Sequence, residues 1–318
     1  MANYHPLVSI IINTHNNIDY LPAAIESAYS QTYPNTEIIV YDNASTDDIR
    51  GLVQQYDERL RYFRSETFLS LGQARNEAVK EAKGELIDFL DADDLFLPTK
   101  LERQVPLFEK ANVGLVICNI WIFKTVDGEV KERLYYHTPP PEGKVFSELL
   151  KKNFISFAAS MIRKDAMGQD PSHWFPEQFN VCTDFDLFLR ISYDYEVRYV
   201  DETLAKWRKH DKNWSIVKLY LLSAEKMMML GRMLDYEPQL FQEYSSEAKQ
   251  FLTHVYCDQL NYYWGKKFKH EAILSAFHAF FLSFQVKHLL KVILILFGDY
   301  TLMQKLRTFL NKDPFSLS

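Results

Sequence analysis

Acidic side chains gather after two apolar runs in the first third of the chain. Asp42 follows the run EIIVY, and three acids follow the run ELIDFL, namely Asp91, Asp93 and Asp94. Carboxylates this close repel one another unless water or a cation neutralises them, and oxygen ligands are those that Mg²⁺ and Mn²⁺ prefer. The pattern predicts a divalent-metal site, although an acidic turn that caps a helix would have the same composition.

The apolar runs before these acids belong to an alternation of strand-like and helix-like segments. Strand-like runs occur at 7–13, 37–41, 60–64, 85–90 and 113–123, and apolar residues recur at helical spacing in 18–28, 49–56 and 72–83. Such alternation implies an α/β layer whose strands are mostly parallel. Ligands of open parallel sheets bind beyond the carboxyl ends of the strands. The acids therefore lie where a binding crevice is expected.

The alternation loosens after Gly128, where a proline run at 139–141 interrupts it. A helical segment is expected at 184–193 and a strand at 196–200. From about residue 216, proline is rare and long segments rich in Leu, Met, Phe and Tyr are typical of helices. We therefore expect a catalytic domain over 1–215 and a helical C-terminal region over 216–318.

The composition limits the compartment and the partners. The 318 residues carry a formal net charge of -6, which argues against a nucleic-acid binder. The three cysteines lie far apart without metal-ligand spacing, as is usual in a reducing compartment. No secretory signal and no apolar run of about 18–20 residues are visible, so no spanning helix is expected. These features favour a cytoplasmic protein that is soluble or bound to a membrane surface.

The C-terminal segment 261–318 differs from the rest in charge. It carries eight Lys and Arg residues against three acids. Two of its stretches, 273–284 and 289–297, are strongly apolar, with Lys287 and His288 between them and Lys291 within the second. A basic, amphipathic segment of this kind suits the anionic inner face of the cytoplasmic membrane. A helical core or a homodimer interface after residue 260 would show the same pattern.

Several motifs resemble those of the inverting family 2 glycosyltransferases, which have the A-type glycosyltransferase fold. In chain order they are 8–16 (VSIIINTHN), 42–47 (DNASTD), 72–76 (GQARN) with 84–94 (GELIDFLDADD), 183–191 (TDFDLFLRI) and 207–215 (WRKHDKNWS). Each motif alone is weak, but five in the expected order over two thirds of the chain are a specific signal. Three positions depart from the family pattern, since His15 replaces a Tyr, Asn43 an Asp and Thr183 a Glu.

The resemblance implies a set of residues that bind the sugar donor. Thr14 and Asn16 belong to the first turn, and Asp42 would accept hydrogen bonds from the nucleotide base. Arg75 would hold the diphosphate, because a guanidinium offers a planar fork of donors. Asp91 would hold the ribose or the metal. For Asp42 and Arg75, a turn-forming acid and a solvated helix-face charge are the plainer interpretations.

The same resemblance implies the metal ligands and the catalytic base. Asp93 and His210 would hold Mn²⁺ or Mg²⁺, whereas Asp94 is as readily a cap of the next helix. Asp184 would take the proton from the acceptor hydroxyl, and one displacement with one base inverts the anomeric centre. Asp186 is expected to be structural, since it points away from Asp184 on a helix.

The function that the resemblance implies is transfer of a sugar from a nucleotide diphosphate donor, most commonly a UDP-hexose, to a hydroxyl of a glycan or lipid-linked acceptor in polysaccharide or cell-surface glycan synthesis. Aromatic residues between Trp174 and Trp214 could form an acceptor platform or simply pack in the core. Two alternatives stay open, a nucleotidyltransferase acting on sugar phosphates and a non-catalytic scaffold. The first would normally carry a Gly-rich phosphate loop, which 10–17 lacks, and retention of the acids argues against the second.

Overall fold

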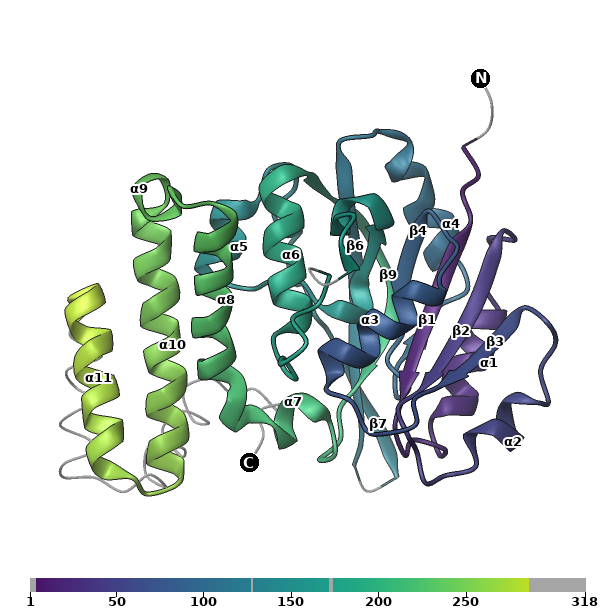
Figure 1. Cartoon of the computed structure of the whole chain (residues 1–318), viewed down its shortest axis with the longest axis horizontal. Coiled ribbons are helices and arrows are strands. Elements are labelled where there is room, and N and C mark those ends of the chain that lie inside the picture. Colours follow the sequence, from purple (N-terminus) through teal and green to yellow (C-terminus); the bar gives the residue numbers. More distant parts are fainter. Residues whose placement is uncertain (1–3, 127, 172–173, 286–318) are drawn as a thin grey trace. The chain divides into compact units, whose positions relative to one another are not determined.

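The computed structural model of the chain describes residues 4–126, 128–171 and 174–285. The chain divides into two compact units, 1–217 and 218–318. The first unit contains a nine-stranded sheet with helices on both faces, and the described part of the second is helical (Figure 1).

One half of the sheet consists of four parallel strands in the order β3-β2-β1-β4. Their bounds are β1 (Val8–Thr14), β2 (Thr36–Asp42), β3 (Leu60–Arg64) and β4 (Leu86–Phe89). β1 lies between β2 and β4 and is buried along almost its whole length, as its β-branched sequence predicts. The predicted Rossmann-like arrangement of these strands is confirmed.

The other half of the sheet mixes directions. It contains β5 (Leu95–Phe96), β6 (Val113–Val126), β7 (Glu129–Leu134), β8 (Ser160–Arg163) and β9 (Glu196–Arg208). β6 and β9 are parallel. β8 lies between β4 and β6 and is antiparallel to both, and β5 is antiparallel to β9. β9 continues beyond the predicted residue 200, because residues 203–208 pair with β6. The sequence prediction stopped early, since only Leu204 and Ala205 of this continuation are buried.

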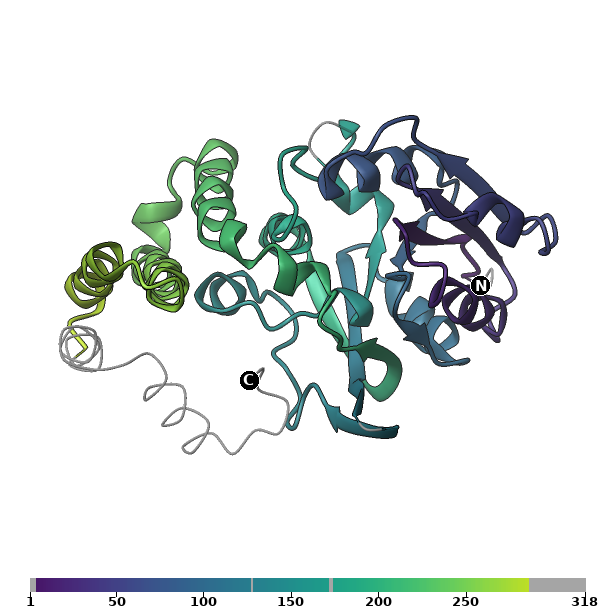
Figure 2. The same ribbon diagram turned by 90° about the horizontal axis from the view of Figure 1, so that it is seen from below.

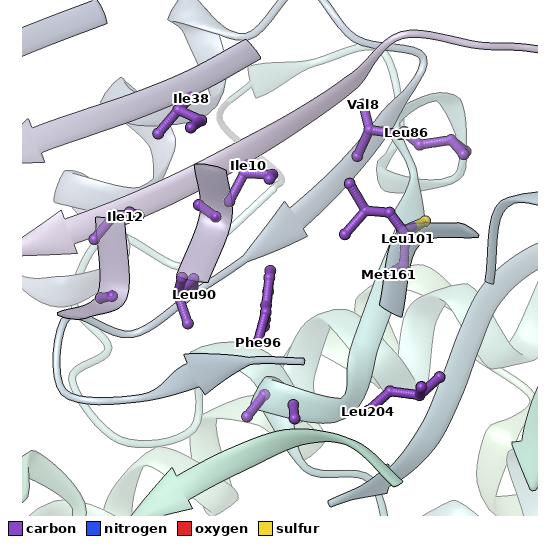
Figure 3. Close-up of a cluster of buried hydrophobic side chains, with 14 of the residues drawn as sticks. Val8, Ile10, Ile12, Ile38, Leu86, Leu90, Phe96, Leu101, Met161 and Leu204 are labelled. Carbon is purple, nitrogen blue, oxygen red and sulfur yellow. The ribbon is translucent and has the colours of Figure 1, made fainter. Parts of the chain in front are cut away.

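Helices cover both faces of the sheet (Figure 2). On one face lie α1 (Leu21–Tyr29), α2 (Ile49–Val53) and α4 (Lys100–Gln104); on the other lie α3 (Leu71–Glu81) and α6 (Thr183–Asp194). Val8, Ile10 and Ile12 alternate along β1 and enter the core under α1, with Leu101 of α4 nearby (Figure 3). Two shorter helices complete this unit, α5 (Phe146–Lys151) and α7 (Trp214–Val217).

The start of α3 is fixed by local chemistry. Ser70 and Gln73 form a capping box, in which the Ser70 hydroxyl accepts the Gln73 N–H at 3.1 Å. Gly72 is required for close approach, since a Cβ there would lie 2.0 Å from the Pro176 carbonyl oxygen. Asn76 adds hydrogen bonds in both directions to the Phe175 backbone. α3 is thereby locked onto the segment that leads into α6.

The second unit is built from helices α8 (Leu222–Tyr236), α9 (Leu240–Glu243), α10 (Ser245–Gly265) and α11 (Lys269–Ser283). α10 and α11 form an antiparallel hairpin around Leu260, Trp264, Ala272 and Ala276. None of the helices in the described ranges is long and apolar enough to cross a membrane. The predicted apolar segment 289–297 lies outside the described residues.

Candidate active site

A cavity of about 520 Å³ opens at the carboxyl edge of the parallel strands. All of its lining residues belong to the first unit. Of the eight residues predicted to bind donor or metal or to act as base, seven line this cavity, namely Thr14, Asn16, Arg75, Asp91, Asp93, Asp184 and His210. Although some of these residues are more than 100 positions apart in sequence, the fold brings them around one space.

Asp42 is the predicted residue that does not line the cavity. Its side chain is fully buried and accepts three hydrogen bonds, from the Ser45 N–H at 2.8 Å, the Tyr62 hydroxyl at 2.8 Å and Arg64 Nη1 at 2.6 Å. The neighbouring Asn43 lines the cavity instead. These three hydrogen bonds fix the position of the Asp42 carboxylate. Its contact with the base stays a prediction.

The turn after β1 forms one wall through His15 and Asn16. His15 Nδ1 lies 2.7 Å from the Asn43 carbonyl oxygen, which can only accept, so the ring proton is on Nδ1. Its Nε2 then accepts from the Asn16 amide at 3.2 Å. Asn16 has a left-handed backbone (φ 53°), and its side-chain oxygen accepts the Thr46 N–H at 2.7 Å. In this structure Asn16 therefore holds the loop that follows β2.

Two polar or aromatic features add to this wall. Thr14 Oγ1 is buried and has no hydrogen-bond partner among the described residues, so a ligand in the cavity can bind it without displacing a protein group. Phe68 is half exposed, and its ring lies 4.6 Å from that of His15 and 6.3 Å from that of Trp214. The sequence analysis missed Phe68, because a single aromatic residue in a loop carries no motif.

A second part of the lining is formed by Asp93, His210 and Asn213. His210 Nε2 lies 2.8 Å from Asp93 Oδ2, and the Asn213 amide donates to the same oxygen at 3.0 Å. The His210 ring stacks on Tyr20, and its Nδ1 is buried with no partner in the described part of the chain. The antiparallel pairing of β5 with β9 brings these residues together across 117 positions of sequence.

The predicted metal ligands, Asp93 and His210, are thus adjacent. Two ligands at right angles around an ion with bonds of about 2.1 Å are about 3 Å apart, close to the 2.8 Å between Asp93 Oδ2 and His210 Nε2. No group of three or more His, Cys, Asp or Glu side chains suited to a metal occurs in the residues that the structure describes. A site with one or two protein ligands is normal for Mg²⁺-type ions that are completed by substrate phosphates and water.

Asp94 does not cap the following helix, and that expectation is wrong. β5 and a turn intervene before α4, which begins at Lys100. The buried Asp94 carboxylate instead accepts the Arg208 N–H at 2.8 Å and so ties the acidic loop to the end of β9. Burial, together with the charges of Asp93 and Asp91, raises the pKa of Asp94 well above its usual range.

A third group of side chains in the cavity lining contains Arg75, Asp91 and Asp184. Arg75 Nη2 lies 3.4 Å from Asp91 Oδ1. Desolvation raises the pKa of Asp91 to about 6, with a smaller contribution from the Asp93 and Asp184 charges against the opposing effect of Arg75. Burial likewise raises the pKa of Asp184, while Arg75 and the Phe185 N–H hold it down. Asp91 and Asp184 therefore interact with the same buried guanidinium.

Asp184 lies in the first turn of α6 and faces the cavity, whereas Asp186 does not. The buried Asp186 carboxylate accepts from Arg190 Nε at 3.1 Å, which confirms its structural role. Tyr135 faces the same space, and burial and the Asp184 charge raise its pKa to about 12. Tyr135 could not be predicted as a site residue, because it follows β7 in a segment without a motif.

The aromatic residues between Trp174 and Trp214 separate into two groups. Trp207 and Trp214 line the cavity. Trp174 is buried elsewhere, and its indole N–H donates to the Gly168 carbonyl at 2.8 Å. Of the three tryptophans in this range that were weighed as an acceptor platform, Trp207 and Trp214 are thus available in the cavity and Trp174 is not.

A polar cavity with several carboxylates at the carboxyl edge of parallel strands lies where open α/β proteins bind their ligands. The family model for glycosyl transferase family 2 matches residues 9–169, which is half of the chain. The chain belongs to glycosyl transferase family 2, and it is a glycosyltransferase.

Among its relatives, TuaG of Bacillus subtilis, a glycosyltransferase assigned to teichuronic acid biosynthesis, is 27% identical over 69% of this chain and 90% of its own length. The UDP-Glc:alpha-D-GlcNAc-diphosphoundecaprenol beta-1,3-glucosyltransferase WfaP of Escherichia coli is 41% identical over 37% of this chain and 47% of its own.

Solved structures confirm the A-type glycosyltransferase fold. S. aureus TarS 1–349 in complex with UDP-GlcNAc has a TM-score of 0.58 at 17% identity, covering 91% of this chain and 88% of that chain. The mannosyltransferase PcManGT from Pyrobaculum calidifontis in complex with GDP-Man and Mn²⁺ has a TM-score of 0.56 at 17% identity, covering 87% and 76%.

Proposed function

We propose that this protein is a metal-dependent, inverting glycosyltransferase in which residues 1–215 form the catalytic domain. The observation that carries the proposal is the arrangement of one cavity. The hydrogen-bonded pair Asp93–His210 and the carboxylate Asp184 line the same space. A donor diphosphate near the first and an acceptor hydroxyl near the second would place the anomeric carbon between them.

Each group has a defined task in this proposal. Asp93 and His210 would hold Mn²⁺ or Mg²⁺, which when bound neutralises charge on the departing diphosphate. Asp91 and the unpartnered Thr14 hydroxyl would bind the donor, and the nucleotide base of the donor would lie beside His15 and Phe68. Asp184 would accept the proton from the attacking hydroxyl. With one base and no second carboxylate acting as nucleophile, the anomeric configuration inverts.

The donor we propose is a UDP-hexose and the acceptor a glycan or lipid-linked sugar in the synthesis of a polysaccharide or cell-surface glycan. TarS has been solved with UDP-GlcNAc, and WfaP uses UDP-Glc on a diphosphoundecaprenol-linked sugar. PcManGT, solved with GDP-Man and Mn²⁺, supports the metal and makes GDP-mannose the donor to compare. Family membership and the carboxylates in the cavity weigh against a nucleotidyltransferase and against a non-catalytic scaffold.

We also propose that residues 216–318 bring the enzyme to the cytoplasmic face of an anionic membrane. In the second unit, the turn between α10 and α11 exposes Lys266, Lys267 and Lys269 around Phe268, which is 53% exposed. Basic residues around an exposed aromatic ring suit a headgroup layer. A lipid-linked acceptor would make such contact useful. A homodimer through the same region is the alternative outcome.

The donor proposal is tested by thermal unfolding of the purified chain with UDP-glucose, UDP-GlcNAc and GDP-mannose, each with Mn²⁺ or with EDTA. A donor at 100 times its dissociation constant should stabilise the fold by about 2.7 kcal/mol. We expect stabilisation by a UDP-sugar with Mn²⁺ and much less with EDTA. Equal stabilisation in EDTA would contradict the metal, and preference for GDP-mannose would contradict the UDP donor.

A further inference from the structure

Aromatic rings line the cavity in two groups. In the first group, the Phe68 ring contacts the rings of His15 and Trp214. In the second, the rings of Tyr135 and Trp207 lie 6.5 Å apart at an angle of 60°. Both residues of this Tyr135–Trp207 pair are half-buried. The proposed function places the nucleotide base at the first group and assigns no ligand to the second.

The position of Tyr135 is fixed by contacts with neighbouring segments. Its N–H donates to the Ile120 carbonyl at 3.0 Å. The ring of Tyr136 meets the Tyr135 ring edge-on, with 4.8 Å between the ring centres. The Asn119 amide in turn bonds both backbone groups of Tyr136, at 2.9 and 3.0 Å, and the Tyr136 hydroxyl donates to the Phe154 carbonyl at 2.8 Å. The ring is therefore ordered before any ligand arrives, which lowers the entropic cost of binding.

The segment 154–157 connects the Tyr135–Trp207 pair with the proposed base. Its first carbonyl accepts the tyrosine hydroxyl described above. At its other end the Phe157 ring packs on the Arg75 guanidinium, which donates to the hydroxyl of Thr183. Thr183 immediately precedes Asp184 in α6. A continuous chain of contacts thus joins the second aromatic group to the start of the helix that carries the base.

This part of the cavity has the chemistry of a sugar subsite. The face of an aromatic ring is negative, so it attracts the polarised C–H groups that a pyranose with equatorial hydroxyls presents on its own face. The hydroxyls at the edge of such a sugar stay free for hydrogen bonds. Asn153 and Ser156, two polar residues beside Phe157 and Phe154, also line the cavity. A pyranose stacked here would have polar partners and a carboxylate within the same space.

We propose that Tyr135 and Trp207 form a stacking platform for the pyranose ring of the acceptor, while the nucleotide base of the donor binds at the other aromatic group. The inference rests on the proposed role of Asp184 as base, which assigns the acceptor and not the donor to this part of the cavity. The platform selects a rigid ring with an apolar face. An acyclic polyol with the same hydroxyls does not satisfy it.

The test measures pyranoside binding by saturation-transfer NMR, with the protein saturated by UDP and Mn²⁺. The probes are the methyl β-pyranosides of glucose, galactose and N-acetylglucosamine, and sorbitol is the acyclic control. We expect at least one pyranoside to bind and sorbitol not to bind. In Trp207→Leu and in Tyr135→Leu the affinity for that pyranoside should fall about tenfold, as expected for loss of one aromatic stacking contact. The affinity for UDP, measured by calorimetry, should be unchanged.

Further variants separate the ring from the rest of the side chain and one aromatic group from the other. Tyr135→Phe and Trp207→Phe keep a ring and should bind the pyranoside almost as tightly as the wild type. Phe68→Leu should weaken UDP instead and leave pyranoside binding to the UDP-saturated protein intact. Tyr236→Leu replaces a half-exposed aromatic residue of α8 outside the cavity and is the matched control. Circular dichroism melts and retained UDP binding show that each platform variant is folded.

Three results would overturn the proposal. The first is that no pyranoside binds the wild type, and the second is that the two Leu variants bind it as tightly as the wild type. The third is a loss of affinity for UDP-glucose but not for UDP in Trp207→Leu, which would place the sugar of the donor on these rings. Failure of the proposed function would look different, because Asp184→Asn would then keep its turnover while the pyranoside still bound at the platform.

Discussion

Two clusters of side chains in the cavity, Asp93 with His210 and Arg75 with Asp184, are constructed in different ways. Asp93 and His210 are 16% and 17% exposed, and they form hydrogen bonds with each other and with Asn213. Arg75 and Asp184 form a second cluster, and burial has the largest effect on the pKa values of both. Hydrogen bonds of accessible side chains can be exchanged for bonds to an incoming ligand. Replacing the partner of a desolvated charge costs more free energy, so such charges are suited to holding a fixed protonation state.

The largest effect on turnover should follow from removal of the Asp93 carboxylate. Asp93→Ala takes away a proposed metal ligand and the acceptor of two hydrogen bonds. Loss of several kcal/mol of charge stabilisation corresponds to a fall in turnover of about 10³-fold. The affinity for the donor in Mn²⁺ should weaken as well. The wild-type protein in EDTA should show a similar loss of donor affinity. The exposed Asp57→Asn serves as control, and an Asp93→Ala enzyme that still responds to Mn²⁺ with normal affinity would move the metal elsewhere.

A smaller effect in the same cluster is expected for His210→Gln. Glutamine can still donate a hydrogen bond to Asp93 but is a poorer metal ligand, so donor affinity in Mn²⁺ should fall about 10- to 100-fold. Calorimetry of the nucleotide in Mn²⁺ and in EDTA measures this. In EDTA the variant and the wild type should bind equally weakly, because only the metal contact is lost. A loss of the same size in EDTA would assign His210 to the nucleotide itself.

The environment of Asp184 leads to a prediction about the pH dependence of turnover. Burial raises the pKa of Asp184 above its ordinary value of 3.8, and the base acts only when ionised. Turnover at saturating donor and Mn²⁺ should therefore rise with pH through that raised pKa, and it should fall about tenfold for each unit below it. A pH profile of turnover that stays flat down to pH 4 would contradict this environment for Asp184.

The smallest effect concerns the second unit. Lys267→Gln removes one exposed charge from the turn between α10 and α11 and should weaken binding to anionic vesicles about fivefold, the effect of about 1 kcal/mol per lysine. Co-sedimentation with vesicles of anionic and of neutral lipid measures it, with the exposed Lys249→Gln of α10 as control. Binding of neither vesicle, with a dimer in solution, would favour the homodimer.

The sequence was sufficient to predict the parallel half of the sheet, and seven of the eight predicted site residues line the cavity. Buried parallel strands such as β1 are continuous β-branched runs, and the motif residues follow the strand ends directly. What it did not predict depends on contacts between distant segments. For example, two of the hydrogen bonds to the Asp42 carboxylate come from Tyr62 and Arg64 on the neighbouring strand.

Two further misses have the same origin. The role of Asn213 in holding Asp93 depends on the pairing of β5 with β9, which no local pattern indicates. The cap predicted for Asp94 was wrong, since that carboxylate binds the end of β9. Local patterns therefore identified the residue types and their strands, whereas the tertiary pairing decided which atoms each side chain contacts.

The most direct test of the central claim is Asp184→Asn, measured for donor affinity and turnover in one preparation. Asparagine keeps the shape and removes the proton acceptor. Turnover should fall by about 10²–10⁴-fold, the usual contribution of general-base catalysis, while donor affinity in Mn²⁺ stays at the wild-type value. Asp186→Asn should act mainly through stability, because its carboxylate is paired with Arg190. Near-normal turnover of Asp184→Asn with its true acceptor would contradict the account and place the base elsewhere.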